Sequence, residues 1–345
     1  MTFAIQFSGP RTPHQSPPVR LPGSVRRTTS IDVTRDDLYG STAIVAIGRD
    51  LATGPDGSIA ARRSARLVGS ADEHRALTGL RAGEGSEPSA PAALERLIGA
   101  STAAGFRREV AAALPDELVA GTLWHLLVDD LVGALLVSGV APQHAEERAG
   151  GGPIEEMTRE FADQMRATMS DICAGWATDA TMLREFGFTG KLPVACGPVA
   201  PPLARSDDPD AIHLLPDLVP HAVRRWRRVD VGPVGPGGDA PIDVHFRDSH
   251  VDEEGVERCV HEYHVAGSVD LGEGTIRSLA AQALVLPWRE CPGSIGSEKN
   301  LRGCRFAEVR DRVRSDLRGT STCTHLNDTL RCLADVGAIA RLAVG

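Results

Sequence analysis

Residues 241–270 read PIDVHFRDSHVDEEGVERCVHEYHVAGSVD, and this stretch decides the fold class. Apolar and polar residues alternate on either side of the acidic, glycine-containing run 252–255, which is typical of a turn. The pattern predicts two antiparallel strands, 241–250 and 256–270, joined as a hairpin. A third strand is expected over 280–286.

The same pattern occurs earlier in the chain at a constant offset of 198 residues. Identical short segments recur in order and without gaps: Val25-Arg26-Arg27 and Val223-Arg224-Arg225, Asp32-Val33 and Asp230-Val231, Arg49-Asp50 and Arg247-Asp248, Gly69-Ser70 and Gly267-Ser268. At an offset of 200, His125-Leu126 corresponds to His325-Leu326. Chance would rarely keep all these matches in order, so we interpret the chain as a diverged tandem duplication.

The duplication divides the chain into four regions. Residues 1–20 are expected to form a flexible N-terminus, and 21–140 the first, degenerate copy of the repeat. Residues 141–217 form a helical connector that ends in a Pro/Gly-rich strap, and 218–345 form the second, site-bearing copy.

Helical apolar spacing follows the strands in both copies: 94–113, 115–136, 307–317 and 325–340. A connector helix is expected over about 154–186, with an interruption at Gly175. Strands followed by helices predict an α+β fold of two related units, each with antiparallel strands followed by helices. We expect a pseudo-two-fold arrangement of the two units.

Composition excludes some classes of partner. The 345 residues carry a net charge of −9, so a broad basic surface for nucleic acid is not expected. The seven cysteines include no Cys-x-x-Cys pair, which argues against a disulfide framework or a four-cysteine zinc site.

The longest apolar stretch, 123–141, contains Asp129 and Asp130, so we interpret it as a buried helix and expect no membrane partner. No apolar signal segment is evident near the N-terminus, and the expected compartment is the cytoplasm. A homodimer is left open.

The second-copy hairpin carries most of the candidate chemistry. If the turn is centred on 253–254, opposed residues on one sheet face are His245 with Glu262, Asp243 with His264, and Arg247 with Val260. The other face is predicted to carry Asp248, His250, Cys259, His261 and Tyr263.

The first copy does not repeat this cluster. Ile47 and Ser64 occupy the positions of His245 and Glu262, whereas Arg49-Asp50 is kept. We therefore interpret Arg247-Asp248 as scaffold and the unique histidines and glutamate as site candidates. The alternative is a solvated polar sheet face.

A histidine beside a carboxylate is a natural acid–base pair, so His245 and Glu262 are the predicted proton-transfer residues. His264 and Asp171 complete the predicted catalytic set. A metal site is the other reading of these residue types, but His261 and His264 are three apart on a strand and point to opposite faces. We assign no metal ligand and no cofactor.

Two further segments could contribute to a site. Cys323, near a predicted helix start, is expected to have a lowered pKa and to lie close to His325 and Asp328. The alternative for His325 is a structural bond to a backbone carbonyl, since the first copy also has a histidine there. In the connector, Cys173 and Trp176 could line a pocket or pack in the core. The predicted substrate-binding residues are Trp176, Cys173, Arg247, His261, Tyr263, Cys323 and His325.

The segments Glu290-Cys291-Pro292 and Cys323-Thr324-His325-Leu326 resemble a bacterial family of unknown function, domain of unknown function 2889. The resemblance covers about 222–335, and the run from Asp171 to Trp176 is similar to longer relatives. The first copy departs from it, because Leu123-Trp124-His125-Leu126 replaces the second of these motifs. The resemblance implies an association with breakdown of aromatic, terpenoid or steroid-like compounds, but no mechanism.

The chain contains no dinucleotide-binding, Walker, nucleophile-elbow or His-Glu-x-x-His motif. We therefore expect a cofactor-independent acid–base enzyme of the lyase, isomerase or hydratase type. Its substrate would be a small, largely apolar compound such as an aromatic or terpenoid catabolite. The alternatives are a non-catalytic ligand-binding or assembly protein, and a metal-dependent enzyme that uses the His/Glu/Asp cluster.

Overall fold

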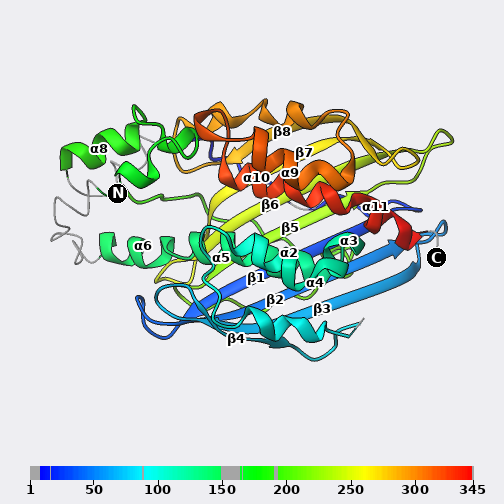
Figure 1. The fold of residues 1–345 in the computed structure, drawn as a ribbon, viewed down its shortest axis with the longest axis horizontal. Helices are drawn as coiled ribbons and strands as arrows, with labels where there is room; N and C mark the ends of the chain where they lie inside the picture. The colour runs from blue at the N-terminus through cyan, green and yellow to red at the C-terminus, as the bar shows by residue number, and fades with distance from the viewer. Residues whose placement is uncertain are drawn as a thin grey trace.

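Eight antiparallel strands form one continuous sheet in the order β4-β3-β2-β1-β5-β6-β7-β8 (Figure 1). The computed structural model describes residues 8–15, 17–87, 89–148, 164, 166–189 and 193–343. The strands are β1 (Val25–Arg35), β2 (Thr42–Thr53), β3 (Ile59–Ala71), β4 (Leu77–Ala82), β5 (Val223–Val231), β6 (Asp239–Val251), β7 (Glu257–Asp270) and β8 (Thr275–Val285). The predicted α+β class and the predicted second-copy strands are confirmed.

The two groups of four strands meet through β1 and β5, which pair in antiparallel fashion. Arg26 lies opposite Asp230 and Arg224 lies opposite Asp32, and both pairs form ion pairs, with nitrogen–oxygen distances of 2.6 and 2.7 Å. Segments almost 200 residues apart in the sequence therefore form the centre of the sheet.

The register of the β6–β7 hairpin differs from the predicted one by two residues. His245 lies opposite His264, and Arg247 lies opposite Glu262. The turn is longer than expected, with Gly255 at a φ of 79°, and a β-bulge follows at Asp248/Ser249. Each feature shifts the pairing by one residue.

Because the two shifts add to an even number, residues beyond the bulge keep their predicted faces. Cys259 lies before the bulge, so its predicted face was wrong. Its Sγ is 3.6 Å from Glu262 Oε2, on the face that also carries His245.

Helices cover one face of the sheet (Figure 1). The α-helices are α2 (Phe106–Ala113), α3 (Pro115–Ala120), α4 (Leu123–Asp129), α5 (Leu131–Val137), α6 (Val140–Arg148), α8 (Thr181–Thr189), α9 (Val309–Asp316), α10 (Thr324–Arg331) and α11 (Val336–Ala340). Short 3₁₀ helices span Ala92–Leu97, Ala174–Trp176, Cys291–Ser294, Ser297–Leu301, Phe306–Glu308, Gly319–Ser321, Cys332–Asp335 and Arg341–Ala343. The predicted helical regions are therefore present but divided into shorter segments.

On the other face of the sheet, chain without regular secondary structure covers central strands, whereas outer strands such as β4 carry exposed residues there. His14 and Pro201 accept hydrogen bonds from Arg247 through their backbone carbonyls, at 2.9 and 2.7 Å. Trp226 packs against Leu203 and Ile212 on this side. The part of the N-terminus that the structure describes thus contacts the sheet through His14.

The connector is only partly described. Most of 154–165, where the predicted helix begins, lies outside the described residues. After this gap, helical residues end near Ser170, a 3₁₀ turn includes Gly175, and α8 follows. The predicted interruption at Gly175 is present.

The helical run Leu123–Arg148 is long and apolar enough to cross a membrane, judged by length and composition alone. However, 78% of its most apolar window is buried inside the structure. This burial agrees with the buried helix predicted over 123–141.

Candidate functional site

A pocket with a volume of about 360 Å³ lies on the helical side of the second half of the sheet. Its walls come from α5, α6 and α10, from strand β7, and from the segments around Trp176 and Trp288. The apolar lining includes Leu136, Val140, Met169, Met182, Trp176 and Trp288. A volume of this size matches small-molecule sites in proteins.

Three segments that the sequence singled out meet in this pocket. Cys173, Cys291 and Cys323 all lie in its lining, one from each segment. The backbone N–H of Ala174 donates to the carbonyl of Thr322 at 2.8 Å. A methyl group at Gly175 would lie 2.5 Å from Cys291 Sγ, so this close approach requires glycine.

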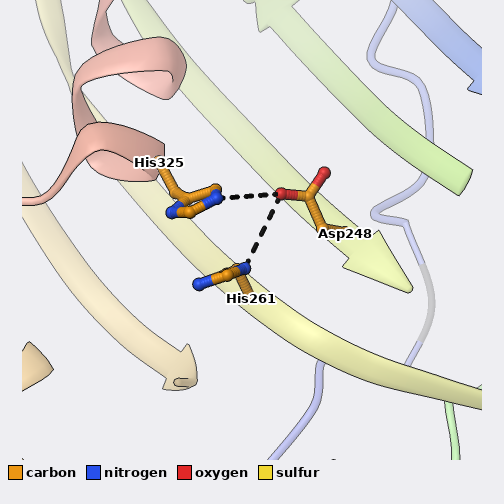
Figure 2. Close-up of side chains that lie close together, drawn as sticks. All are labelled: Asp248, His261 and His325. Carbon is orange, nitrogen blue, oxygen red and sulfur yellow. Dashed lines mark ion pairs between the residues drawn. The ribbon is translucent and has the colours of Figure 1, made fainter. Parts of the chain in front are cut away.

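One wall of the pocket carries polar side chains. Figure 2 shows Asp248 and His261 on neighbouring strands, with His325 reaching them from α10. His261 Nδ1 lies 3.8 Å from Asp248 Oδ2, and His325 Nε2 lies 3.7 Å from the same oxygen. The two imidazole rings are stacked, with centroids 3.5 Å apart and planes inclined by 15°.

Asp248 forms hydrogen bonds and an ion pair with an arginine rather than with the histidines. The Arg225 guanidinium donates to both carboxylate oxygens, at 2.8 and 2.9 Å, and also to Asp328 at 2.8 Å. The histidine–oxygen distances are too long for hydrogen bonds. The Asp248 carboxylate therefore forms its ion pair with the buried guanidinium, while the imidazoles lie beside it.

Both imidazoles are neutral at pH 7. Burial, together with the positive charge of Arg225, lowers the pKa of His325 to about 3. Burial also lowers the pKa of His261 well below its ordinary value. A neutral imidazole offers one N–H donor and one acceptor nitrogen. His261 Nδ1 has no hydrogen-bond partner among the described residues.

Asp248, His261 and His325 carry metal-ligating atoms within 4.8 Å of one another. An imidazole binds a metal through a lone pair in its ring plane. Two nearly parallel rings 3.5 Å apart cannot both direct such lone pairs at one ion, and Arg225 already occupies both oxygens of the carboxylate. The residues as placed do not fit a shared metal ion.

The lowered thiol pKa predicted for Cys323 was wrong. Burial raises the pKa of Cys323 above its ordinary value, despite the position of the thiol just before α10. Burial likewise raises the pKa of Cys173 to about 12. Cys323 Sγ does lie near His325 Nδ1, at 3.8 Å. Both thiols are therefore protonated side chains of the pocket wall.

Tyr263 is completely buried, and its hydroxyl lies 3.4 Å from Ser294 Oγ. Burial raises the pKa of this hydroxyl well above its ordinary value, and an interaction with Cys323 raises it further. Tyr263 thus supports the pocket wall from beneath Cys323.

His245 and Glu262 pair as predicted, with His245 Nε2 2.5 Å from Glu262 Oε1. They lie on the opposite face of the sheet from the pocket, under the segment that contains His14, whose N–H donates to Glu262 at 3.1 Å. Arg247 donates to Glu262 as well, at 3.0 Å. Both partners are at most 2% exposed, and burial lowers the pKa of His245 to about 4.

The other two predicted catalytic residues also lie outside the pocket lining. His264 pairs with Asp243 at 2.6 Å, on the same face as His245. Asp171 accepts hydrogen bonds from the N–H and hydroxyl of Thr178, at 2.8 and 2.9 Å, within its own loop. The structure therefore brings together most of the predicted substrate-binding residues and separates the predicted catalytic ones from them.

The sequence analysis missed one residue that lies behind the pocket wall and one that lies in the lining. Asp248 was interpreted as scaffold because Asp50 matches it, but it also lies beside the histidine pair. Trp288 was not singled out, although it stands two residues before the Glu290-Cys291-Pro292 segment. A search for aromatic residues next to the family segments could have found it.

The fold and this pocket define an α+β protein with a largely apolar pocket that contains two histidines. Residues 223–338 match the model of a family described as protein of unknown function (DUF2889). The match runs from β5 into α11 and covers the wall that carries His261, Cys291 and His325, whereas the wall formed by α5, α6 and the segment around Trp176 lies outside it. No curated protein and no solved structure matched the chain.

Proposed function

We propose that the protein is an enzyme of the lyase, isomerase or hydratase type that acts on a small, largely apolar compound. The observation that carries this proposal is the placement of His261 and His325 in the wall of an otherwise largely apolar pocket. A few converging polar groups in an apolar cavity are typical of small-molecule sites.

The pocket favours a substrate with a ring or short branched body and one oxygen function. Trp176 and Trp288 offer flat apolar surfaces for such a body, and Met182 can adapt to its shape. An aromatic or terpenoid compound has this character. A hydroxyl or carbonyl oxygen would then face the imidazoles.

His261 and His325 are proposed to act together: the N–H of one ring polarises that oxygen, and the acceptor nitrogen of the other ring takes a proton from the neighbouring carbon and returns one to it. In the neutral form each ring can donate and accept a hydrogen bond at once, without the cost of burying a positive charge. A neutral imidazole with a lowered pKa suits the role of a hydrogen-bond donor to a carbonyl. His245 and Glu262 are not assigned to the reaction, since their pair is buried on the opposite face.

Proton exchange of a ketone in deuterated water tests this proposal. 4-Ethylcyclohexanone is the probe, and the measurement is protein-dependent deuterium uptake beside its carbonyl, followed by NMR. The wild type is expected to accelerate this exchange, and His261→Ala and His325→Ala are expected to remove most of the acceleration. His264→Ala, on the opposite face, is the matched control.

Circular dichroism of each variant shows whether it is folded. No acceleration by the wild type, or equal acceleration by all folded variants, would count against the enzyme proposal. Probe binding without exchange would favour the second candidate, a non-catalytic ligand-binding protein. The same pocket supports that candidate because its volume and apolar lining suffice for binding.

We also propose that the two halves arose by tandem duplication of one unit. The β1–β5 pairing supports this view, because Arg26 and Arg224 are related by the 198-residue offset and so are their partners, Asp230 and Asp32. The ion pairs of Arg27 with Asp50 and of Arg225 with Asp248 correspond in the same way.

A further inference from the structure

A second pocket, with a volume of about 460 Å³, lies between the helices of the two halves. Helices α2, α3, α4 and α5 supply one side, and α9 and α10 supply the other, as their neighbouring positions in Figure 1 show. It is separate from the pocket of about 360 Å³ that contains His261 and His325, which we call the histidine pocket. Thr324 lies in the wall of both pockets. We call it the inter-half pocket.

Arginines dominate the charged lining of the inter-half pocket. It carries five arginines and three aspartates: Arg107, Arg108, Arg310, Arg314, Arg331, Asp129, Asp311 and Asp328. Each buried aspartate is shared by two guanidinium groups. Asp129 pairs with Arg331 at 2.8 Å and with Arg107 at 3.5 Å.

The arginines deep in the inter-half pocket form ion pairs, whereas one arginine near its surface does not. Arg107 pairs with Asp328 at 2.6 Å, and Arg310 pairs with Asp335 at 2.8 Å. Arg108 is exposed and has no carboxylate partner among the described residues. The pocket therefore presents a guanidinium that a bound anion could pair with.

A buried histidine in the same lining also lacks partners. His125 is fully buried, and neither of its ring nitrogens has a hydrogen-bond partner among the described residues. Leaving a buried polar group unsatisfied is costly, so a ligand that bonds to it gains affinity. Burial lowers the pKa of His125, which keeps the ring neutral and leaves it one N–H to donate.

The rest of the wall is apolar and small, which indicates the body of the ligand. The lining includes Ala103, Ala104, Ala111, Leu118, Val132 and Leu317. These side chains leave room for a compact apolar group beside the charged residues. An inorganic anion would leave that surface uncovered.

We propose that the inter-half pocket binds a small organic carboxylate, with Arg108 as ion-pair partner and His125 as buried hydrogen-bond donor. The proposal does not rest on the enzyme proposal, because it concerns a different pocket and different residues. Thr324 connects the two sites through the first turn of α10, which also carries His325.

Calorimetric titration of the full chain with benzoate, at constant ionic strength, tests this site. Arg108→Gln is expected to weaken benzoate binding about tenfold, because it removes a charge-assisted bond. His125→Phe is expected to weaken it similarly while keeping a ring of similar shape in the buried position. Arg81→Gln, an exposed arginine on β4, is the control and should bind as the wild type does.

Two ligand controls separate the chemistry. Benzamide has the same ring without the charge and should not bind, and inorganic phosphate has the charge without the apolar body and should bind more weakly. Phosphate binding that exceeds benzoate binding would overturn the organic-carboxylate assignment. Absence of benzoate binding by the wild type, or binding by the Arg108 and His125 variants as tight as that of the wild type, would overturn the site itself. Neither variant is expected to change deuterium exchange of the ketone.

Discussion

The two halves of the molecule share a scaffold but differ where a ligand would sit. In both, a buried arginine on a central strand pairs with an aspartate on the next strand, as Arg27 with Asp50 and Arg225 with Asp248. Under the proposed duplication, the place in the first half that corresponds to the histidine pocket holds a cavity of only about 80 Å³, against about 360 Å³ in the second.

Side chains account for the difference. At the repeat offsets, Arg63 stands in the position of His261, and Trp124 stands in that of Thr324. Trp124 is almost fully buried and lies in the wall of the small cavity. The ion pairs therefore belong to the scaffold of both halves. The volume of the pocket instead depends on the side chains at the positions of His261 and Thr324.

The largest expected effect concerns the shared scaffold. Arg225→Met should lower the free energy of unfolding by about 3–5 kcal/mol, because it leaves Asp248 buried without a guanidinium partner and removes one of the two partners of Asp328. Arg27→Met should have an effect of the same order in the first half. Urea denaturation followed by circular dichroism measures both. Little loss of stability in either variant would contradict a common scaffold role.

A smaller effect concerns pH and the histidines that distinguish the second half. The folded-state pKa of His325 is about 3, below the ordinary value of 6.5, so the unfolded chain binds a proton between these pH values and the folded protein does not. The contribution of His325 to the free energy of unfolding is therefore fully present above about pH 6.5 and is lost as the pH falls toward 3. Between pH 7 and pH 4, the free energy of unfolding of His325→Gln should therefore fall by less than that of the wild type. The expected difference is on the order of 1–3 kcal/mol.

Urea denaturation at the two pH values gives this difference directly. His74→Gln, at an exposed position of the first half, is the control. A variant with the same acid sensitivity as the wild type would show that His325 is not buried as described.

A third prediction concerns the close approach that shapes the pocket. Gly175→Ala would place a methyl group 2.5 Å from Cys291 Sγ and 3.1 Å from Trp288 Cδ1. The lining must shift, at a cost of about 1–3 kcal/mol of stability, and affinity for 4-ethylcyclohexanone should fall several-fold. Gly139→Ala, also in the lining but 3.6 Å from its nearest neighbour, should change neither quantity much. Calorimetry and urea denaturation separate the two variants.

The smallest expected effect is that of zinc ions. Because the stacked rings of His261 and His325 cannot both ligate one ion, zinc should leave the melting temperature nearly unchanged. Melting curves with zinc and with a chelator make the comparison. Saturable stabilisation that disappears in His261→Ala would show that the rings turn to bind metal.

Much of the fold could be predicted because strand alternation and helical spacing are local properties of the sequence. The β6–β7 register could not, since it depends on turn geometry and on the bulge at Asp248/Ser249. The pairing of β1 with β5 also depends on contacts between distant segments, which no local pattern specifies.

For the site, the segments containing Cys173, Cys291 and Cys323 were predicted better than the chemistry of their side chains. His245 and Glu262 do pair, but the sequence could not show that irregular chain covers their face of the sheet. Likewise, a thiol near a helix start suggested a lowered pKa, and burial of Cys323 outweighs that effect.

Calorimetric titration of 4-ethylcyclohexanone into the wild type and into Thr324→Trp tests the central claim most directly. The substitution gives the second half the residue that stands at the corresponding position of the first, where Trp124 lies beside a small cavity. We expect the wild type to bind the ketone and the folded Thr324→Trp variant to bind it at least tenfold more weakly. Equal binding by the two proteins would contradict the assignment of the histidine pocket as the functional site.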